Sequence, residues 1–92
     1  MNKKPTTVCQ EADDIINGER RSDYGPVSKS FQRIADLWSP ILGVQVTKEQ
    51  VGMCMIQLKI SRELNKHKRD NIVDIIGYAA LIENMETENH KK

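Results

Sequence analysis

The segment from 71 to 86 constrains the fold most, because a helix over this range would be apolar on almost every side. Its apolar residues are Ile72, Val73, Ile75, Ile76, Ala79, Ala80, Leu81, Ile82 and Met85. A helix that is apolar nearly all round is normally buried. The rest of a 92-residue chain offers little material to cover it. We therefore expect a homo-oligomer in which this helix forms the interface between subunits.

Two local signals place the starts of two more helices. Thr7 and Thr47 are each followed three residues later by a glutamine, which is the spacing of a capping box. Apolar residues then recur at intervals of three and four after each threonine. This pattern predicts amphipathic helices over about 8–17 and 48–64.

A further helix is expected between these two, with its start capped at or near Ser28. Pro40 is expected to end or kink it, and Gly43 to close the segment. The apolar residues that share one face of this helix are Phe31, Ile34, Ala35, Trp38, Ile41 and Leu42.

A short polar connection, residues 65–70, precedes the apolar helix over 71–86, and Asp70 is expected to cap that helix. A link this short implies an antiparallel helical hairpin. Gly77 costs about 1 kcal/mol relative to alanine inside a helix, so it predicts the close approach of another helix or of a ligand. The fold class is therefore all-α, a compact bundle of about four helices with a C-terminal antiparallel hairpin.

The pattern predicts one helical domain over 7–86, with disordered ends at 1–6 and 87–92. Fourteen Lys and Arg against thirteen Asp and Glu give a net charge of +1, which does not support generic nucleic-acid binding. The chain has no apolar run near the roughly 18 residues of a membrane span, and no apolar core of a signal peptide. We expect a cytoplasmic protein without membrane contact.

The cysteines and histidines give no sign of a metal site. Cys9 and Cys54 lack CxxC spacing and are expected to be buried thiols, and Cys54 lies in the apolar run VGMCMIQL. His67 and His90 have no ligand partner at a useful spacing.

The first candidate site is the segment ERRSDYG. Arg20 and Arg21 offer planar forks of donors that fit phosphate or carboxylate. Asp23 and Tyr24 add an acceptor and a stacking face, and Gly25 allows the backbone to come close to a ligand. A solvated turn, stabilised by its own aspartate and tyrosine, explains the same residues and is favoured when they are taken alone.

The second candidate site combines two helices. Lys59 and Arg62 share a face of one helix, and Asp70 and Asp74 share a face of the next. In an antiparallel hairpin the two basic residues reach the level of Asp74 and Tyr78. The alternatives are a polar pocket for a phosphorylated ligand and a purely structural salt bridge between the helices.

The blocks INGERRSDYG, FQRIADLW, KISR and DNIVDIIGYAAL, taken in this order, resemble a family of short phage and prophage proteins over residues 11 to 83. This family has no established activity. It is distantly similar to phage domains linked to nucleotide modification and loosely similar to the all-α MazG-like nucleoside triphosphate pyrophosphohydrolases. The polar pattern of the family falls on Glu19, Arg20, Asp23, Tyr24, Gly25, Lys59, Arg62, Asp70, Asn71, Asp74 and Tyr78.

The chain departs from the MazG-like pattern at the metal site. Those enzymes hold magnesium with an E-x-x-E followed by an E-x-x-D, whereas the position of the first motif here reads Lys59-x-x-Arg62. Basic groups in place of carboxylates favour binding an anion over coordinating a metal. We therefore expect a nucleotide-like phosphorylated ligand, such as a signalling nucleotide of a host defence. We expect the protein to bind it without catalysis and without a cofactor.

In this hypothesis the basic residues contact phosphate, the tyrosines stack on a base, and the aspartates accept hydrogen bonds. One alternative is a divergent MazG-like hydrolase with Glu11, Asp14, Asp70 and Asp74 around Mg²⁺. Another is a helical module that binds a protein through its apolar faces.

Overall fold

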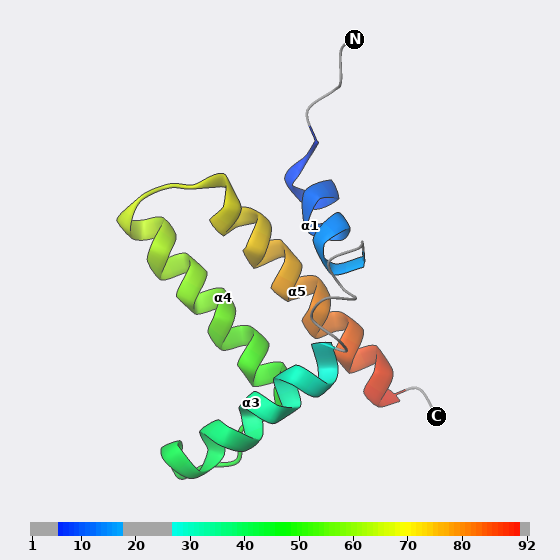
Figure 1. The fold of residues 1–92 in the computed structure, drawn as a ribbon, viewed down its shortest axis with the longest axis vertical. Helices are drawn as coiled ribbons and strands as arrows, with labels where there is room; N and C mark the ends of the chain where they lie inside the picture. The colour runs from blue at the N-terminus through cyan, green and yellow to red at the C-terminus, as the bar shows by residue number, and fades with distance from the viewer. Residues whose placement is uncertain (1–5, 18–26, 91–92) are drawn as a thin grey trace.

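The computed structural model describes residues 6–17 and 27–90. These residues form the helices α1 (Val8–Asn17), α3 (Val27–Leu42), α4 (Lys48–Asn65) and α5 (Arg69–His90), and no strand occurs among them (Figure 1). The predicted all-α fold is confirmed, and the helix predicted over 8–17 is found with the same ends.

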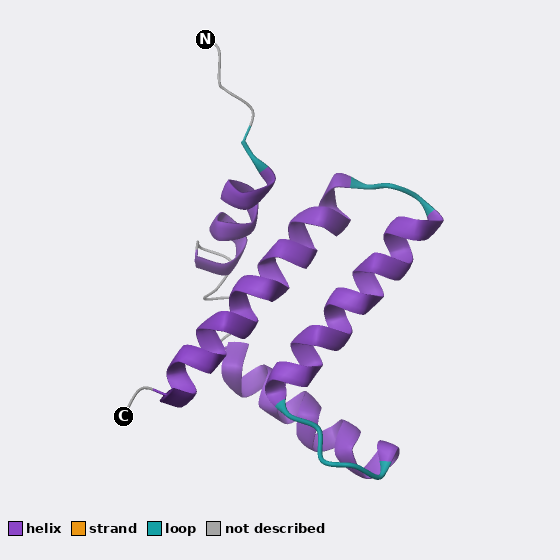
Figure 2. Cartoon of the chain, turned by 180° about the vertical axis from the view of Figure 1, so that it is seen from behind, coloured by secondary structure: helices purple, strands orange, loops and turns teal. Residues whose placement is uncertain are grey.

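The longest helix, α5, lies between two others. It runs antiparallel to α4 on one side and carries α1 on the other, while α3 crosses the base of α4 (Figures 1 and 2). The predicted C-terminal hairpin is thus present. No helix in the described ranges is long and apolar enough to cross a membrane.

Both predicted capping boxes are formed. The N–H of Thr7 donates to the Oε1 of Gln10 over 3.0 Å, and the N–H of Gln10 donates back to the Thr7 hydroxyl over 3.1 Å. Thr47 and Gln50 make the same pair of bonds over 2.9 and 3.1 Å. These reciprocal bonds satisfy backbone donors that have no partner inside the helix, which fixes where α1 and α4 begin.

Helix α3 begins at Val27, so Ser28 lies inside it and does not cap it. The Ser28 hydroxyl accepts a hydrogen bond from the Lys48 Nζ over 2.8 Å instead, which ties α3 to the start of α4. The helix continues through Pro40 to Leu42, and Gly43 closes it with a φ of 72°. Positive φ is a conformation that glycine adopts without steric cost.

The main core lies where α3, α4 and α5 meet. Phe31 and Ala35 are buried there, and Ile34 and Trp38 pack against it as predicted. The other buried members of this core are Val46, Val51 and Met85. The end of the predicted apolar face of α3 behaves differently, because Ile41 and Leu42 remain exposed where the helix extends past α4.

The turn between α4 and α5 depends on Glu63 rather than on Asp70. Helix α5 begins at Arg69, so Asp70 lies in its first turn and the prediction that it caps the helix is wrong. The Glu63 carboxylate accepts hydrogen bonds from the Lys68 N–H over 3.0 Å and from the Asn71 side chain over 3.1 Å. The Glu63 side chain therefore ties the connecting loop and the start of α5 back to α4.

Glu63 should make the hairpin sensitive to acid. Its contacts with His67, the Lys68 N–H and Asn71 hold the pKa of Glu63 below its ordinary 4.5. The stability that these contacts contribute is therefore complete above about pH 4.5 and is lost as the pH falls through the lower pKa of the folded state.

The variant Glu63→Gln is expected to unfold at lower urea concentration than the natural chain at neutral pH. Below the pKa of Glu63 the difference should shrink, because the natural side chain is then neutral as well. Urea unfolding of both proteins over this pH range measures the effect. A difference that does not change with pH would show that ionisation of Glu63 is not involved.

The prediction that both cysteines are buried is wrong, because Cys9 and Cys54 are exposed. Within VGMCMIQL only Val51 and Gly52 are fully buried, whereas Met53 and Cys54 are exposed. An apolar neighbourhood in sequence does not imply burial when successive residues of a helix point in different directions.

Helix α5 uses its apolar sides within one chain, since it packs against both α4 and α1. Among the described residues, the large apolar side chains that stay exposed lie on α3, α4 and the loop between them. Association of two copies through the segment 71–86 stays a prediction, and the structure gives most of its apolar surface partners in the same chain.

Candidate functional site

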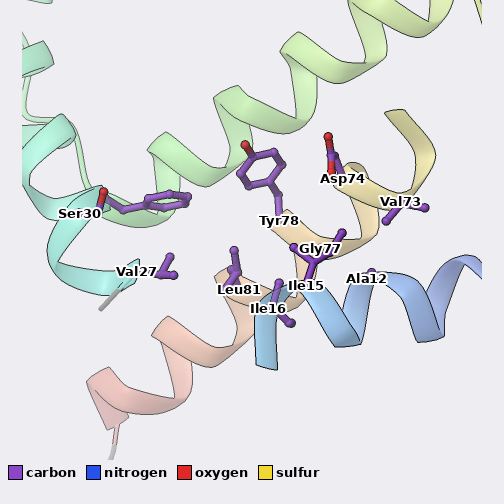
Figure 3. Close-up of a pocket in the computed structure, with 11 residues that line it drawn as sticks. Ala12, Ile15, Ile16, Val27, Ser30, Val73, Asp74, Gly77, Tyr78 and Leu81 are labelled. Atoms are coloured by element: carbon purple, nitrogen blue, oxygen red, sulfur yellow. The ribbon is translucent and has the colours of Figure 1, made fainter. Parts of the chain in front are cut away.

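A cavity of about 450 Å³ lies between α1, α3 and α5 (Figure 3). Most of its wall is apolar, and three polar side chains, Ser30, Asp74 and Tyr78, interrupt it. The remaining lining residues are Ala12, Ile15, Ile16, Val27, Phe31, Val73, Gly77 and Leu81. Its size and lining are typical of a small-molecule site, which combines an apolar wall with a few placed polar groups.

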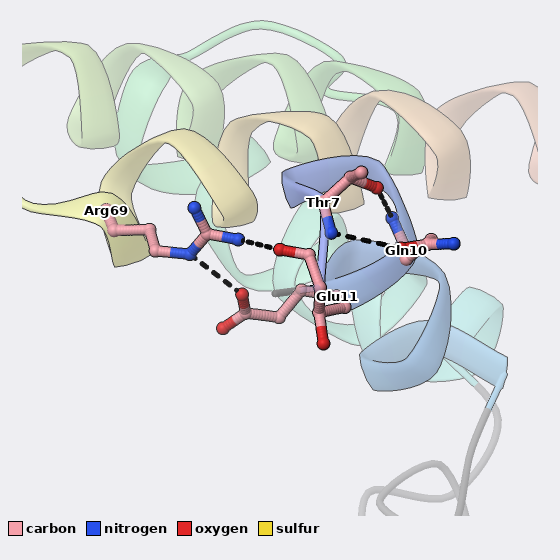
Figure 4. A network of polar contacts seen from close by, with 5 residues as sticks. Thr7, Gln10, Glu11 and Arg69 are labelled. Carbon is pink, nitrogen blue, oxygen red and sulfur yellow. Dashed lines mark hydrogen bonds and ion pairs between the residues drawn. The ribbon is translucent and has the colours of Figure 1, made fainter. Parts of the chain in front are cut away.

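The cavity exists because α1 is fixed against the start of α5. The Arg69 guanidinium donates from its Nε to the Glu11 carboxylate over 3.0 Å and also donates to the carbonyl oxygen of Thr6 (Figure 4). The amphipathic pattern of α1 then turns Ala12 and Ile16 toward α5. Since α3 approaches α5 on the other side, a space remains between the three helices.

The polar border of the cavity faces α4. Figure 3 shows the Tyr78 hydroxyl and the Asp74 carboxylate pointing toward that helix, away from the apolar wall. The Lys59 Nζ lies 2.9 Å from the Asp74 Oδ2, which forms a salt bridge between α4 and α5. The structural alternative, a salt bridge between the helices, is therefore present, and Asp74 is at the same time one of the residues that line the cavity.

Tyr78 is half-buried, and this burial raises the pKa of its hydroxyl above the ordinary 10.0. The nearby Asp74 carboxylate adds to the rise, while Lys59 and Arg62 oppose it. The hydroxyl is therefore protonated at neutral pH and can donate a hydrogen bond. Its ring lies 6.2 Å from that of Phe31, centroid to centroid, and the two rings form an aromatic part of the wall.

Comparison with known proteins assigns this chain to a family. Residues 7–86 match the family described as "Domain of unknown function (DUF6378)". The chain belongs to the DUF6378 family. It is also 43% identical over 82 residues to the Gene 55 protein of Mycobacterium phage L5, and 34% identical over 83 residues to the Gene 55 protein of Mycobacterium phage D29.

The alignments cover 87% and 89% of this DUF6378 chain, but 53% and 55% of the two phage proteins. The chain therefore spans about half the length of these relatives. The predicted membership of a phage protein family is confirmed, whereas similarity to MazG-like enzymes stays a prediction. No solved structure matches the chain.

The structure brings together part of the site that the sequence of this DUF6378 member predicts. Lys59, Asp74 and Tyr78 meet at the border of the cavity, and Arg62 is close enough to act on the pKa of Tyr78. Asp70 is exposed and does not line the cavity. The residues of the first candidate site, Arg20, Arg21, Asp23, Tyr24 and Gly25, lie outside the described residues.

The residues that sequence reasoning missed are the apolar ones of the cavity wall. Ile15, Ile16 and Leu81 have the spacing of core residues, and nothing in that spacing distinguishes a filled core from a cavity. Gly77 offered a signal, since a glycine inside a helix suggested a close neighbour. A Cβ built on Gly77 would meet the Ile16 Cγ2 at 3.7 Å, which is ordinary contact, so close helix packing does not require this glycine.

The carboxylates of the hydrolase alternative do not converge. Glu11 is engaged by Arg69, Asp74 is paired with Lys59, and Asp14 is exposed on α1. Within the described ranges, no three or more His, Cys, Asp or Glu side chains are placed to hold a metal ion together. The predicted arrangement of Glu11, Asp14, Asp70 and Asp74 around Mg²⁺ is therefore not present in this structure.

Proposed function

We propose that this chain binds a nucleotide-like phosphorylated molecule in the cavity between α1, α3 and α5, without transforming it. The observation that carries the proposal is the half-buried Tyr78, which lines an apolar cavity and whose hydroxyl is affected by the positive charges of two residues of α4. A nucleotide has the same division, because its base is flat and largely apolar while its phosphates are charged.

The cavity suits the base. Its wall combines aliphatic side chains with the rings of Phe31 and Tyr78, on which a flat ring can pack. Asp74 and Ser30 can bond the polar edge of a base, since a carboxylate accepts hydrogen bonds from ring and amino N–H groups.

The phosphate is assigned to the side of the cavity that faces α4. Lys59 is engaged by Asp74, whereas Arg62 has no ion-pair partner among the described residues and is exposed. Guanidinium presents a planar fork of donors that fits phosphate oxygens. Arg20, Arg21 and Tyr24 are proposed as further contacts, because the segment 18–26 joins Asn17 to Val27, and Val27 lines the cavity.

Arg62→Ala is expected to weaken nucleotide binding by about tenfold to a hundredfold, because one charge-assisted hydrogen bond contributes about 1.5–3 kcal/mol. Titration calorimetry with nucleoside mono-, di- and triphosphates and with cyclic nucleotides measures the loss. Lys66→Ala is the matched control, since it removes the same charge from an exposed site at the end of α4.

If the natural chain binds a nucleotide and Arg62→Ala binds it with the same affinity, Arg62 does not contact the ligand. An equal loss in Lys66→Ala would show that only the overall charge of the helix end matters.

In the setting of a phage protein, binding without turnover fits sequestration of a nucleotide that a host uses as a defence signal. The proposal predicts that a bound nucleotide is recovered chemically unchanged after the protein is denatured. Release of pyrophosphate or of a monophosphate from a triphosphate would favour the hydrolase alternative instead.

A further inference from the structure

The side of α4 that faces away from α5 is largely apolar, and it is exposed in the part of the chain that the structure describes. We define the outer face of α4 as Gln50, Met53, Cys54, Gln57, Leu58, Ile60, Ser61 and Leu64, all of which are exposed. Leu64 is 84% exposed and Met53 is 52% exposed. Four large apolar side chains on one exposed helix face are unusual for a surface that meets only water.

This face carries no charged side chain, although 29% of the residues of the chain are charged. The charges of α4 lie elsewhere on the helix, at Lys48, Glu49, Lys59, Arg62 and Glu63. Two identical surfaces can therefore meet along this face without bringing like charges together. A charged partner would find no charged side chain on this face to pair with.

The spacing on the outer face is that of a helix–helix seam. Met53, Gln57, Ile60 and Leu64 follow one another at intervals of four, three and four residues, which keeps them on one line along α4. The line is almost symmetric about its middle, with large apolar residues at both ends. An antiparallel copy places Met53 of one chain opposite Leu64 of the other, and Gln57 opposite Ile60.

The end of α3 provides a second contact for such a copy. Figures 1 and 2 show the C-terminal half of α3 projecting past the base of α4 on the side away from α5. Leu37, Ile41 and Leu42 on this projection are 62%, 81% and 61% exposed. In an antiparallel pair, each projection lies beside the far end of the other copy's α4, whereas in a parallel pair the two projections meet at one end.

We infer that the outer face of α4 is the interface of a homodimer, in which a second copy of this chain packs antiparallel along the seam. The surface is isologous, so each copy contributes the same residues to it. No residue of α4 is among the described residues that line the cavity, so this inference does not depend on the proposed function.

Leu64→Asp tests the inference, because it places two charges in the proposed interface and changes nothing in the core of one chain. The natural chain is expected to sediment and scatter light at twice its mass of 10.5 kDa at micromolar concentration. The variant is expected at the mass of one chain, with its dissociation constant raised at least about a hundredfold. Circular dichroism should show the same helix content in both proteins.

Ala79→Glu is the matched control, since it adds a similar charge to an exposed position of α5. This variant is expected to remain dimeric. A dimer that survives Leu64→Asp but not Ala79→Glu would overturn the inference and assign the interface to α5. A natural chain that is monomeric would also overturn the inference. The corresponding face of the longer relatives would then be expected to pack against their additional segment.

The orientation has its own test in chains that carry Cys9→Ser, where Cys54 is the remaining thiol. An antiparallel pair brings Cys54 near Ser61 of the second copy, so a short bismaleimide should join two chains efficiently only after Ser61→Cys is added. Efficient joining through Cys54 alone would overturn the antiparallel arrangement.

Discussion

Tyr78→Ala is expected to abolish nucleotide binding and to lower the free energy of unfolding by about 2 kcal/mol. The ring of Tyr78 borders the cavity, packs against the core and contacts the ring of Phe31. Its loss therefore removes both the surface on which a base would pack and a part of the contact between α3 and α5. The stability cost is below that of a fully buried aromatic residue because Tyr78 is only half-buried.

Tyr78→Phe tests the contribution of the hydroxyl to binding, since the surface for the base and the contact with α3 both stay in place. It keeps the ring and removes the hydroxyl, so the free energy of unfolding should change by less than about 0.5 kcal/mol while affinity falls about tenfold. Urea unfolding and titration calorimetry on the same preparations give both quantities. Full affinity in Tyr78→Ala, once folding is confirmed, would place the ligand elsewhere on the molecule.

Gly52→Val is expected to lower the free energy of unfolding by about 3 kcal/mol, because α5 leaves no room for a side chain at this position of α4. A Cβ on Gly52 would lie 2.7 Å from the Ile82 Cγ1 and 3.1 Å from its Cδ1, and 3.4 Å from the Phe31 ring. The Ile82 side chain has to move, and the β-branched valine adds a second group to the same space. Thermal and urea unfolding measure the loss.

Gly77→Ala is the control for this effect, since it also replaces a buried glycine inside a helix. The new Cβ would make an ordinary contact with Ile16, so the gain in helix propensity should raise the free energy of unfolding by up to about 1 kcal/mol. Equal changes in Gly52→Val and Gly77→Ala would show that helix propensity, and not the approach of α4 to α5, determines both results.

The features that could be predicted from the sequence are those that depend on neighbouring residues. The Thr7 and Thr47 capping boxes join residues three positions apart, so they fix the starts of α1 and α4 wherever those helices pack. The pairing of Lys59 with Asp74 could also be predicted, because a short connection forces the last two helices into a hairpin.

The features that were missed depend on how three or four helices pack. Cys54 sits among apolar neighbours, but both sides of α4 are apolar, and only packing decides that Val51 points inward and Cys54 outward. Asp70 has the residue type of a helix cap, but α5 begins one residue earlier, and the carboxylate that bonds the turn is that of Glu63 on the preceding helix. The cavity wall joins Ile16, Phe31 and Leu81 from three helices, and no spacing along the chain reveals that they leave a space between them.

Native mass spectrometry of the purified chain, mixed with a panel of nucleoside phosphates and cyclic nucleotides, shows whether the chain binds such a molecule unchanged. We expect an adduct with the unmodified mass of one member of the panel, present on the natural chain and absent from Tyr78→Ala. The panel includes the free nucleosides and inorganic phosphate, which show whether both parts of the ligand are needed. If the natural chain carries no adduct, or if the adduct persists in Tyr78→Ala, the cavity beside Tyr78 is not a nucleotide site.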